Sequence, residues 1–155
     1  MIKKLNLNRV GLGLFALLLV GAYQLLPLLL PQTDETVVPE PGCNLQKQTC
    51  TVTLADGAQV ALTMGTKPVP MITPFSVAVK TSGFVPKRLE LDFAGVDMNM
   101  GLNRPELLLQ NEGVYTAEAS LPVCISGQMD WLVTLFVERG RQRIAIPFRL
   151  TSVGH

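Results

Sequence analysis

The sequence contains a single histidine, His155, and it is the last of the 155 residues. Hydrolases that activate a serine or cysteine nucleophile need a histidine held in fixed geometry, which a chain terminus rarely provides. The sequence also lacks a P-loop, a dinucleotide-binding glycine motif and a C-x-x-C pair, and its scattered carboxylates show no acid/base spacing. These absences predict a protein that is not an enzyme.

Positive charge is scarce in the main part of the chain. Lys3, Lys4 and Arg9 precede the first apolar run, and the remaining ten basic residues stand against twelve acidic ones, a net charge of −2. Proteins that bind nucleic acid concentrate lysine and arginine on one face. The arginines on either side of Gly140 are explained more simply as charges that keep a hairpin turn soluble. No nucleic-acid partner is therefore expected.

An uncharged stretch of 24 residues, 10–33, is the longest apolar feature of the chain. As a helix it is about 36 Å long, enough to cross a hydrocarbon core of about 30 Å. Basic residues precede it and acidic residues follow it, which predicts a cytoplasmic N-terminus over 1–9 and an exported remainder. We therefore predict a transmembrane helix and signal anchor over 10–31, in a bacterial inner (plasma) membrane. The alternative is a cleaved secretory signal, which also exports the domain.

Residues 32–42 are rich in proline and acid and lack periodicity, which indicates an extended linker. The domain predicted over 43–155 contains short β-type runs separated by turn residues, with Asp56-Gly57 as a strong hairpin signal. About seven strands are predicted, at 51–54, 59–64, 75–80, 88–93, 114–121, 131–138 and 142–150. The predicted fold class is all-β, an immunoglobulin-like antiparallel β-sandwich preceded by one transmembrane helix.

The alternation within these strands predicts one buried face but does not always identify it. On the first long strand, Leu89, Leu91 and Phe93 form an apolar set. On strand 131–138 the alternating set Leu132, Thr134 and Phe136 is expected to be buried in the same way, according to which face of the strand points inward.

The three cysteines are an odd number, so in an oxidising compartment at most one internal pair forms. Cys43 and Cys50 are predicted to pair, on spacing and compartment, which stabilises the fold by about 2.5 kcal/mol in the chain-entropy model. Cys124 is then left over. A lone exported thiol is either buried as a small hydrophobic group or held by a metal.

Sulfur is the soft chemistry that the domain does contain, and it is concentrated in two short segments. Met98 and Met100 share a face if their segment is extended, and Cys124 and Met129 follow further along the chain. Thioether and thiolate sulfur suits Cu(I), which does not need histidine. The candidate metal ligands are therefore Met98, Met100, Cys124 and Met129. The alternative is that these side chains fill the core, as methionine and free cysteine often do.

Part of the domain resembles the FixH-like and YtkA-like group. The matching positions are Gly113-Val114-Tyr115, Gly127, Trp131 at the start of a long alternating strand, Gly140, and a return strand that ends at 144–148. The resemblance covers the anchor and residues 89–150, and it implies an extracytoplasmic immunoglobulin-like domain behind one N-terminal membrane helix. That group is associated with cytochrome oxidase assembly and copper supply. The chain departs from it by placing Gln128, Met129 and Asp130 before Trp131, so no site residue is carried over.

Two functions follow as expectations. The first is a membrane-anchored periplasmic accessory protein that binds or delivers Cu(I), as a copper chaperone, for assembly of a respiratory oxidase or for copper homeostasis. The second is a metal-free interaction module, which assists assembly of a membrane complex through a sheet edge or a loop end.

Overall fold

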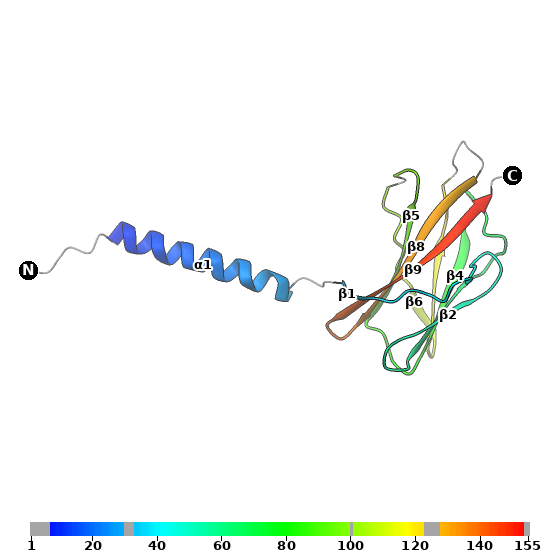
Figure 1. Cartoon of the computed structure of the whole chain (residues 1–155), viewed down its shortest axis with the longest axis horizontal. Coiled ribbons are helices and arrows are strands. Elements are labelled where there is room, and N and C mark those ends of the chain that lie inside the picture. The colour runs from blue at the N-terminus through cyan, green and yellow to red at the C-terminus, as the bar shows by residue number, and fades with distance from the viewer. Residues whose placement is uncertain (1–6, 30–32, 100, 123–127, 154–155) are drawn as a thin grey trace, which may run out of the picture. The chain divides into compact units, whose positions relative to one another are not determined.

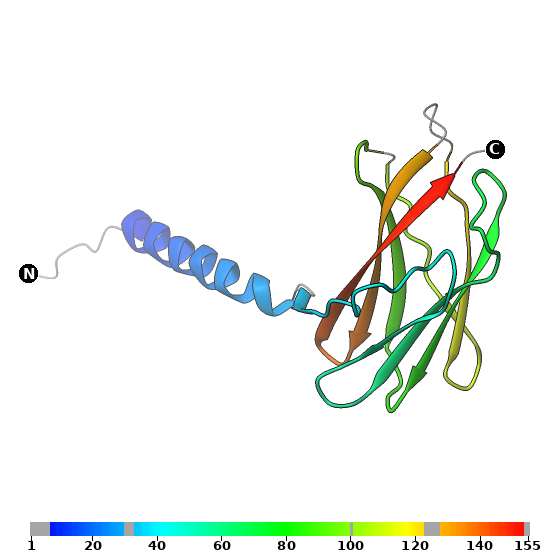
Figure 2. The same ribbon diagram turned by 45° about the vertical axis from the view of Figure 1, so that its right-hand side comes forward.

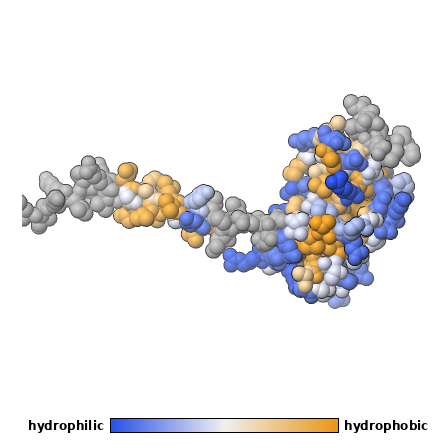
Figure 3. Space-filling view, viewed as in Figure 1, coloured by the Kyte–Doolittle hydropathy of each residue, from blue (hydrophilic) through white to orange (hydrophobic). Residues whose placement is uncertain are grey.

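The chain divides into two compact units, Met1–Gln32 and Thr33–His155. The computed structural model describes residues 7–29, 33–99, 101–122 and 128–153. Helix α1, Leu7–Leu29, forms in the first unit, where the strong helix former leucine dominates. Its described side chains, at 11–25, are exposed, and Figure 3 shows apolar atoms along it. Over the described residues, no helix combines the length and the apolar character needed to cross a membrane.

The second unit is a sandwich of two β-sheets (Figure 1). One sheet has the order β1-β9-β8-β5, with β1 Thr33–Thr36, β5 Arg88–Gly95, β8 Gln128–Arg139 and β9 Gln142–Val153. The other has the order β2-β3-β4-β7-β6, with β2 Cys50–Thr53, β3 Gln59–Met64, β4 Phe75–Ser82, β6 Leu108–Asn111 and β7 Val114–Ala119. Neighbouring strands are antiparallel, except that β1 runs parallel to β9. The predicted two-sheet β architecture is confirmed.

All seven predicted strands are present, and two more occur. β1 lies within the predicted linker, where its backbone pairs with the free edge of β9, so the compact unit begins at Thr33 rather than near Cys43. β6 is fully exposed and lies at the edge of its sheet, beside β7. Neither β1 nor β6 alternates apolar with polar residues in sequence.

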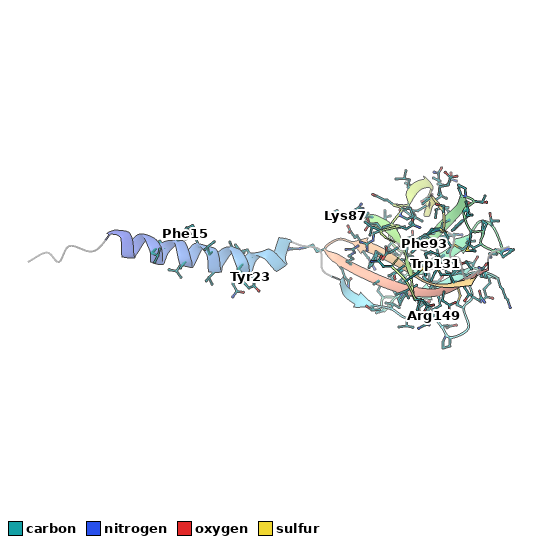
Figure 4. All side chains as sticks on the ribbon, turned by 90° about the horizontal axis from the view of Figure 1, so that it is seen from above. Phe15, Tyr23, Lys87, Phe93, Trp131 and Arg149 are labelled. Atoms are coloured by element: carbon teal, nitrogen blue, oxygen red, sulfur yellow. A yellow bond between two sulfur atoms is a disulfide. The ribbon has the colours of Figure 1, made fainter. Side chains whose placement is uncertain are left out.

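The core lies between the sheets, and β8 shows which of its two apolar faces is buried. Trp131, Val133, Leu135 and Val137 are buried, whereas Leu132 is 39% exposed. Phe136 also points outward, and the guanidinium groups of Arg104 and Arg143 cover its ring at 5.2 and 4.3 Å. Figure 4 shows Phe93 and Trp131 inside the sandwich and Lys87 and Arg149 at its surface.

A disulfide joins Cys43 to Cys50, with Cα atoms 5.7 Å apart, which confirms the predicted pair. It closes the loop before β2, and Gln46 in this loop contacts the opposite sheet. There the Gln46 side chain accepts from Val69 N–H at 2.7 Å and donates from Nε2 to Thr151 O at 2.7 Å. The disulfide loop therefore ties residue 69 to the last residues of β9.

Candidate functional site

Three strands of the four-stranded sheet reach the same end of the sandwich (Figure 2). β5 finishes there, because Gly95 pairs with Trp131 near the start of β8. β9 finishes there too, because Val153 pairs with Gln128. Beyond the last pair of β5, Val96 N–H donates to Asp130 O at 2.9 Å. The chain that follows β5 therefore leaves the sheet directly beside the first residues of β8.

Met98 lies in this loop and is 43% exposed. It lines an open hollow of about 350 Å³ formed by residues 94–99 and Gly101. The loop turns sharply, since Asn99 Oδ1 accepts from Gly101 N–H at 2.9 Å and Gly101 has φ of 79°. An unbranched thioether is thus presented at the surface rather than packed into the core.

Met129 reaches the same end from inside the sandwich. It is 4% exposed and has the inward orientation of Trp131, two residues further along β8. Its cross-strand partner is Ser152, which is also completely buried. The burial of Met129 agrees with the alternative that it fills the core. Its position at the end of the sheet agrees with the prediction that it is a metal ligand.

Met71 is a third methionine at this end, and nothing local in the sequence connects it to the others. Its Sδ atom lies 3.4 Å from Ser152 Oγ, which in turn accepts a hydrogen bond from Trp131 Nε1 at 2.8 Å. The contact joins residues 81 apart in sequence. It is a tertiary contact that no local sequence pattern predicts. We name this part of the domain the methionine end, defined by Met71, Met98 and Met129.

Two of the four predicted ligands lie outside the described residues. Met100 and Cys124 are not described, so the structure places Met98 and Met129 at the methionine end and leaves the other two as predictions. Within the described residues, no three histidine, cysteine, aspartate or glutamate side chains gather as a metal-binding group. Thioethers are a separate ligand class, and they are what the methionine end offers.

Apolar side chains are exposed beside the methionine end. Ile72 is 69% exposed and Leu102 is 81% exposed, and with Pro122 they line a second open hollow of about 450 Å³. Leu102 directly follows the Met98 loop. Exposed apolar side chains thus lie close to the Met98 loop in the sequence.

The shifted titratable groups lie at the opposite end of the sandwich. The pKa of Asp56, in the turn between β2 and β3, is lowered chiefly by a hydrogen bond from the Arg139 side chain. The pKa of Arg88, at the start of β5, is raised chiefly by its hydrogen bond to Glu106. Both are surface ion pairs. At the methionine end, Asp130 is exposed and accepts from Thr151 Oγ1 at 2.6 Å.

No family model matches the chain, and neither the curated proteins nor the solved structures searched contain a match.

Proposed function

We propose that this chain is a membrane-anchored accessory protein whose exported, immunoglobulin-like β-sandwich binds Cu(I) at the methionine end and delivers it. The delivered copper serves the assembly of a respiratory oxidase or copper homeostasis. The observation that carries the proposal is the 2.9 Å hydrogen bond from Val96 N–H to Asp130 O. Because of it, the Met98 loop lies beside the first residues of β8, which include Met129, so two methionines distant in sequence share one end of the domain.

The ligand chemistry supports a cuprous cargo. Thioether sulfur is soft and suits Cu(I), and the sequence adds Met100 and Cys124 as two further sulfur candidates. Thioethers bind without losing a proton, so the affinity depends little on pH except through the Cys124 thiol. The 43% exposure of Met98 supports transfer, because a receiving protein can contact an exposed ligand directly.

The anchor is supported by the uncharged run of residues 10–33 and by the basic residues that precede it. Alkaline extraction of membranes from cells that make the chain tests this part. An anchored chain stays in the membrane pellet and needs detergent for release. Intact chain in the aqueous fraction would contradict both the anchor and the topology derived from it.

A metal-free interaction module is the second candidate, and the edge strand β6 favours it. All four residues of β6 are exposed, including Leu108 at 64% and Leu109 at 61%. An open edge with apolar side chains can accept a strand from a partner. Replacing both leucines by lysine should then impair assembly of the membrane complex, whereas Met98→Leu should leave assembly unchanged.

Copper binding is tested by anaerobic titration of the full chain in detergent micelles, in competition with a chromophoric Cu(I) chelator. We expect one Cu(I) per chain. The double variant Met98→Leu with Met100→Leu should bind at least about tenfold more weakly. The matched control is Met64→Leu, because Met64 is 1% exposed in the core and should not affect affinity. Failure of the wild type to compete, or an unchanged isotherm for the double variant, would remove the copper proposal.

A further inference from the structure

We propose that Met71 supplies a further thioether to Cu(I) at the methionine end, and that Ser152 and Trp131 are positioning residues for it. This inference rests on the proposed copper function. It adds a ligand that lies 27 residues before Met98 in the sequence and on the other side of the sandwich core.

A hydrogen-bonded relay fixes the Met71 side chain. The Trp131 indole can only donate, so Ser152 Oγ accepts from Nε1 at 2.8 Å. The hydroxyl proton is then directed to Met71 Sδ or to Met129 O, each 3.4 Å away. A thioether has two lone pairs, so a hydrogen bond from Ser152 leaves one for a metal ion. Partners of this kind orient metal ligands in many sites.

The register of β8 and β9 brings Met71 close to Met129. Ser152 and Met129 are direct cross-strand partners, and both side chains are buried on the inner face. Such pairs have Cβ atoms about 4.5–5.5 Å apart. Met71 Sδ therefore contacts the side chain of the cross-strand neighbour of Met129.

The residue that follows Met71 has an unfavourable backbone conformation. Ile72 has φ of 66°, a region that β-branched residues rarely adopt. Thr73 N–H donates to Met71 O at 2.7 Å, which closes a three-residue γ-turn. Ile72 N–H donates to Leu121 O at 2.8 Å and secures the turn. Strain of this type concentrates at binding sites, where the surrounding structure maintains it for function.

The disulfide loop holds the same segment from the other side. Gln46 binds Val69 N–H and Thr151 O, each at 2.7 Å, so residue 69 and the residue before Ser152 are fixed to one amide group. Met71 is thus constrained at the γ-turn, at its sulfur and two residues upstream. A methionine that only fills space needs none of these constraints. Met64, which is 1% exposed, has the ordinary position of a core side chain on β3.

Methyl NMR of the full chain in micelles tests the inference without any substitution. The chain has six methionines, so ¹³C labelling of their ε-methyl groups gives at most six resonances, assigned with Met→Leu variants. On anaerobic addition of one equivalent of Cu(I), the Met71 resonance should shift in proportion to metal, while the Met64 resonance stays in place. A Met71 resonance that does not move when Cu(I) binds would overturn the inference.

Affinity measurements give an independent readout. Met71→Leu should weaken Cu(I) binding at least about tenfold, and Ser152→Ala should weaken it by a smaller factor. In the Ser152→Ala chain the change that Cu(I) causes in the Met71 methyl resonance should also become smaller, whereas a purely structural role of Ser152 would leave that metal-induced change as large as in the wild type. Met64→Leu is the control. If the wild type binds Cu(I) and Met71→Leu binds equally well, the inference fails alone, whereas no binding by the wild type refutes the proposed function as well.

Discussion

Gly113 lies in the turn between β6 and β7 and makes a close contact that no other residue type tolerates. It has φ of 72°, and an added Cβ atom would lie 2.9 Å from the Thr81 carbonyl oxygen. The backbone is fixed there, since Thr81 N–H donates to Gly113 O at 2.8 Å. Gly140, in the turn between β8 and β9, has a similar φ of 62° but open space around the position of its Cβ. The two glycines therefore separate backbone conformation from steric contact.

The expected cost differs between the two alanine variants. An L-residue in the left-handed region costs about 1–2 kcal/mol. The reduced freedom of the unfolded chain returns about 0.4–1 kcal/mol, so Gly140→Ala should lose about 1 kcal/mol. Gly113→Ala should lose about 1 kcal/mol more, because Thr81 must move and its hydrogen bond weakens.

The assay is urea unfolding followed by tryptophan fluorescence. The chain has one tryptophan, Trp131, which is completely buried in the sandwich, so its emission reports on this unit. Equal losses of unfolding free energy in Gly113→Ala and Gly140→Ala would refute the close contact with Thr81. A larger loss in Gly140→Ala would refute the assignment of conformations as well.

Two further predictions concern the disulfide and the ion pair between Asp56 and Arg139, which lies at the end of the sandwich opposite the methionine end. Replacing Cys43 and Cys50 by serine should lower the unfolding free energy by about 2.5 kcal/mol, measured by urea denaturation, and no change would show that the loop is already ordered in the unfolded chain. Arg139→Gln should raise the pKa of Asp56 toward 3.8, because the Arg139 hydrogen bond is the largest cause of the lowered pKa. The lowered pKa means that the pair stabilises the fold at neutral pH and that this contribution disappears as the pH falls through it, so the variant should lack this acid-dependent loss. NMR titration of the Asp56 carboxyl group measures the shift, and an unchanged pKa would contradict the pairing.

The sequence predicts the elements that bury a face and misses those that do not. The seven predicted strands all have apolar residues at alternate positions or a turn signal such as Asp56-Gly57 beside them. β1 has the sequence TDET and becomes a strand only because the edge of β9 is available. β6 is exposed throughout and is held by β7. In both strands the cause is a tertiary partner that no local pattern contains.

The candidate site was predictable in type but not in arrangement. Composition and spacing indicate Met98 and Met129 as candidate soft ligands, and the pairing of β5 with β8 then places both at one end of the sandwich. The placement of Met71 at this end depends on its contact with the hydroxyl group of Ser152, 81 residues away in the sequence. The sequence does not distinguish this serine from any other. The inward face of β8 was ambiguous for a related reason, because Phe136 is apolar but is covered by arginine side chains outside the sheet.

The parallel pairing of β1 with β9 also determines how far the entry of the chain into the sandwich lies from the methionine end. The chain enters the sandwich beside Arg143, near the start of β9, and the methionine end lies ten residues further on, at Val153. Extended chain rises about 3.3 Å per residue, so roughly 33 Å of β9 separate Arg143 from Val153. The start of the domain's first strand and the methionine end therefore lie at opposite ends of β9.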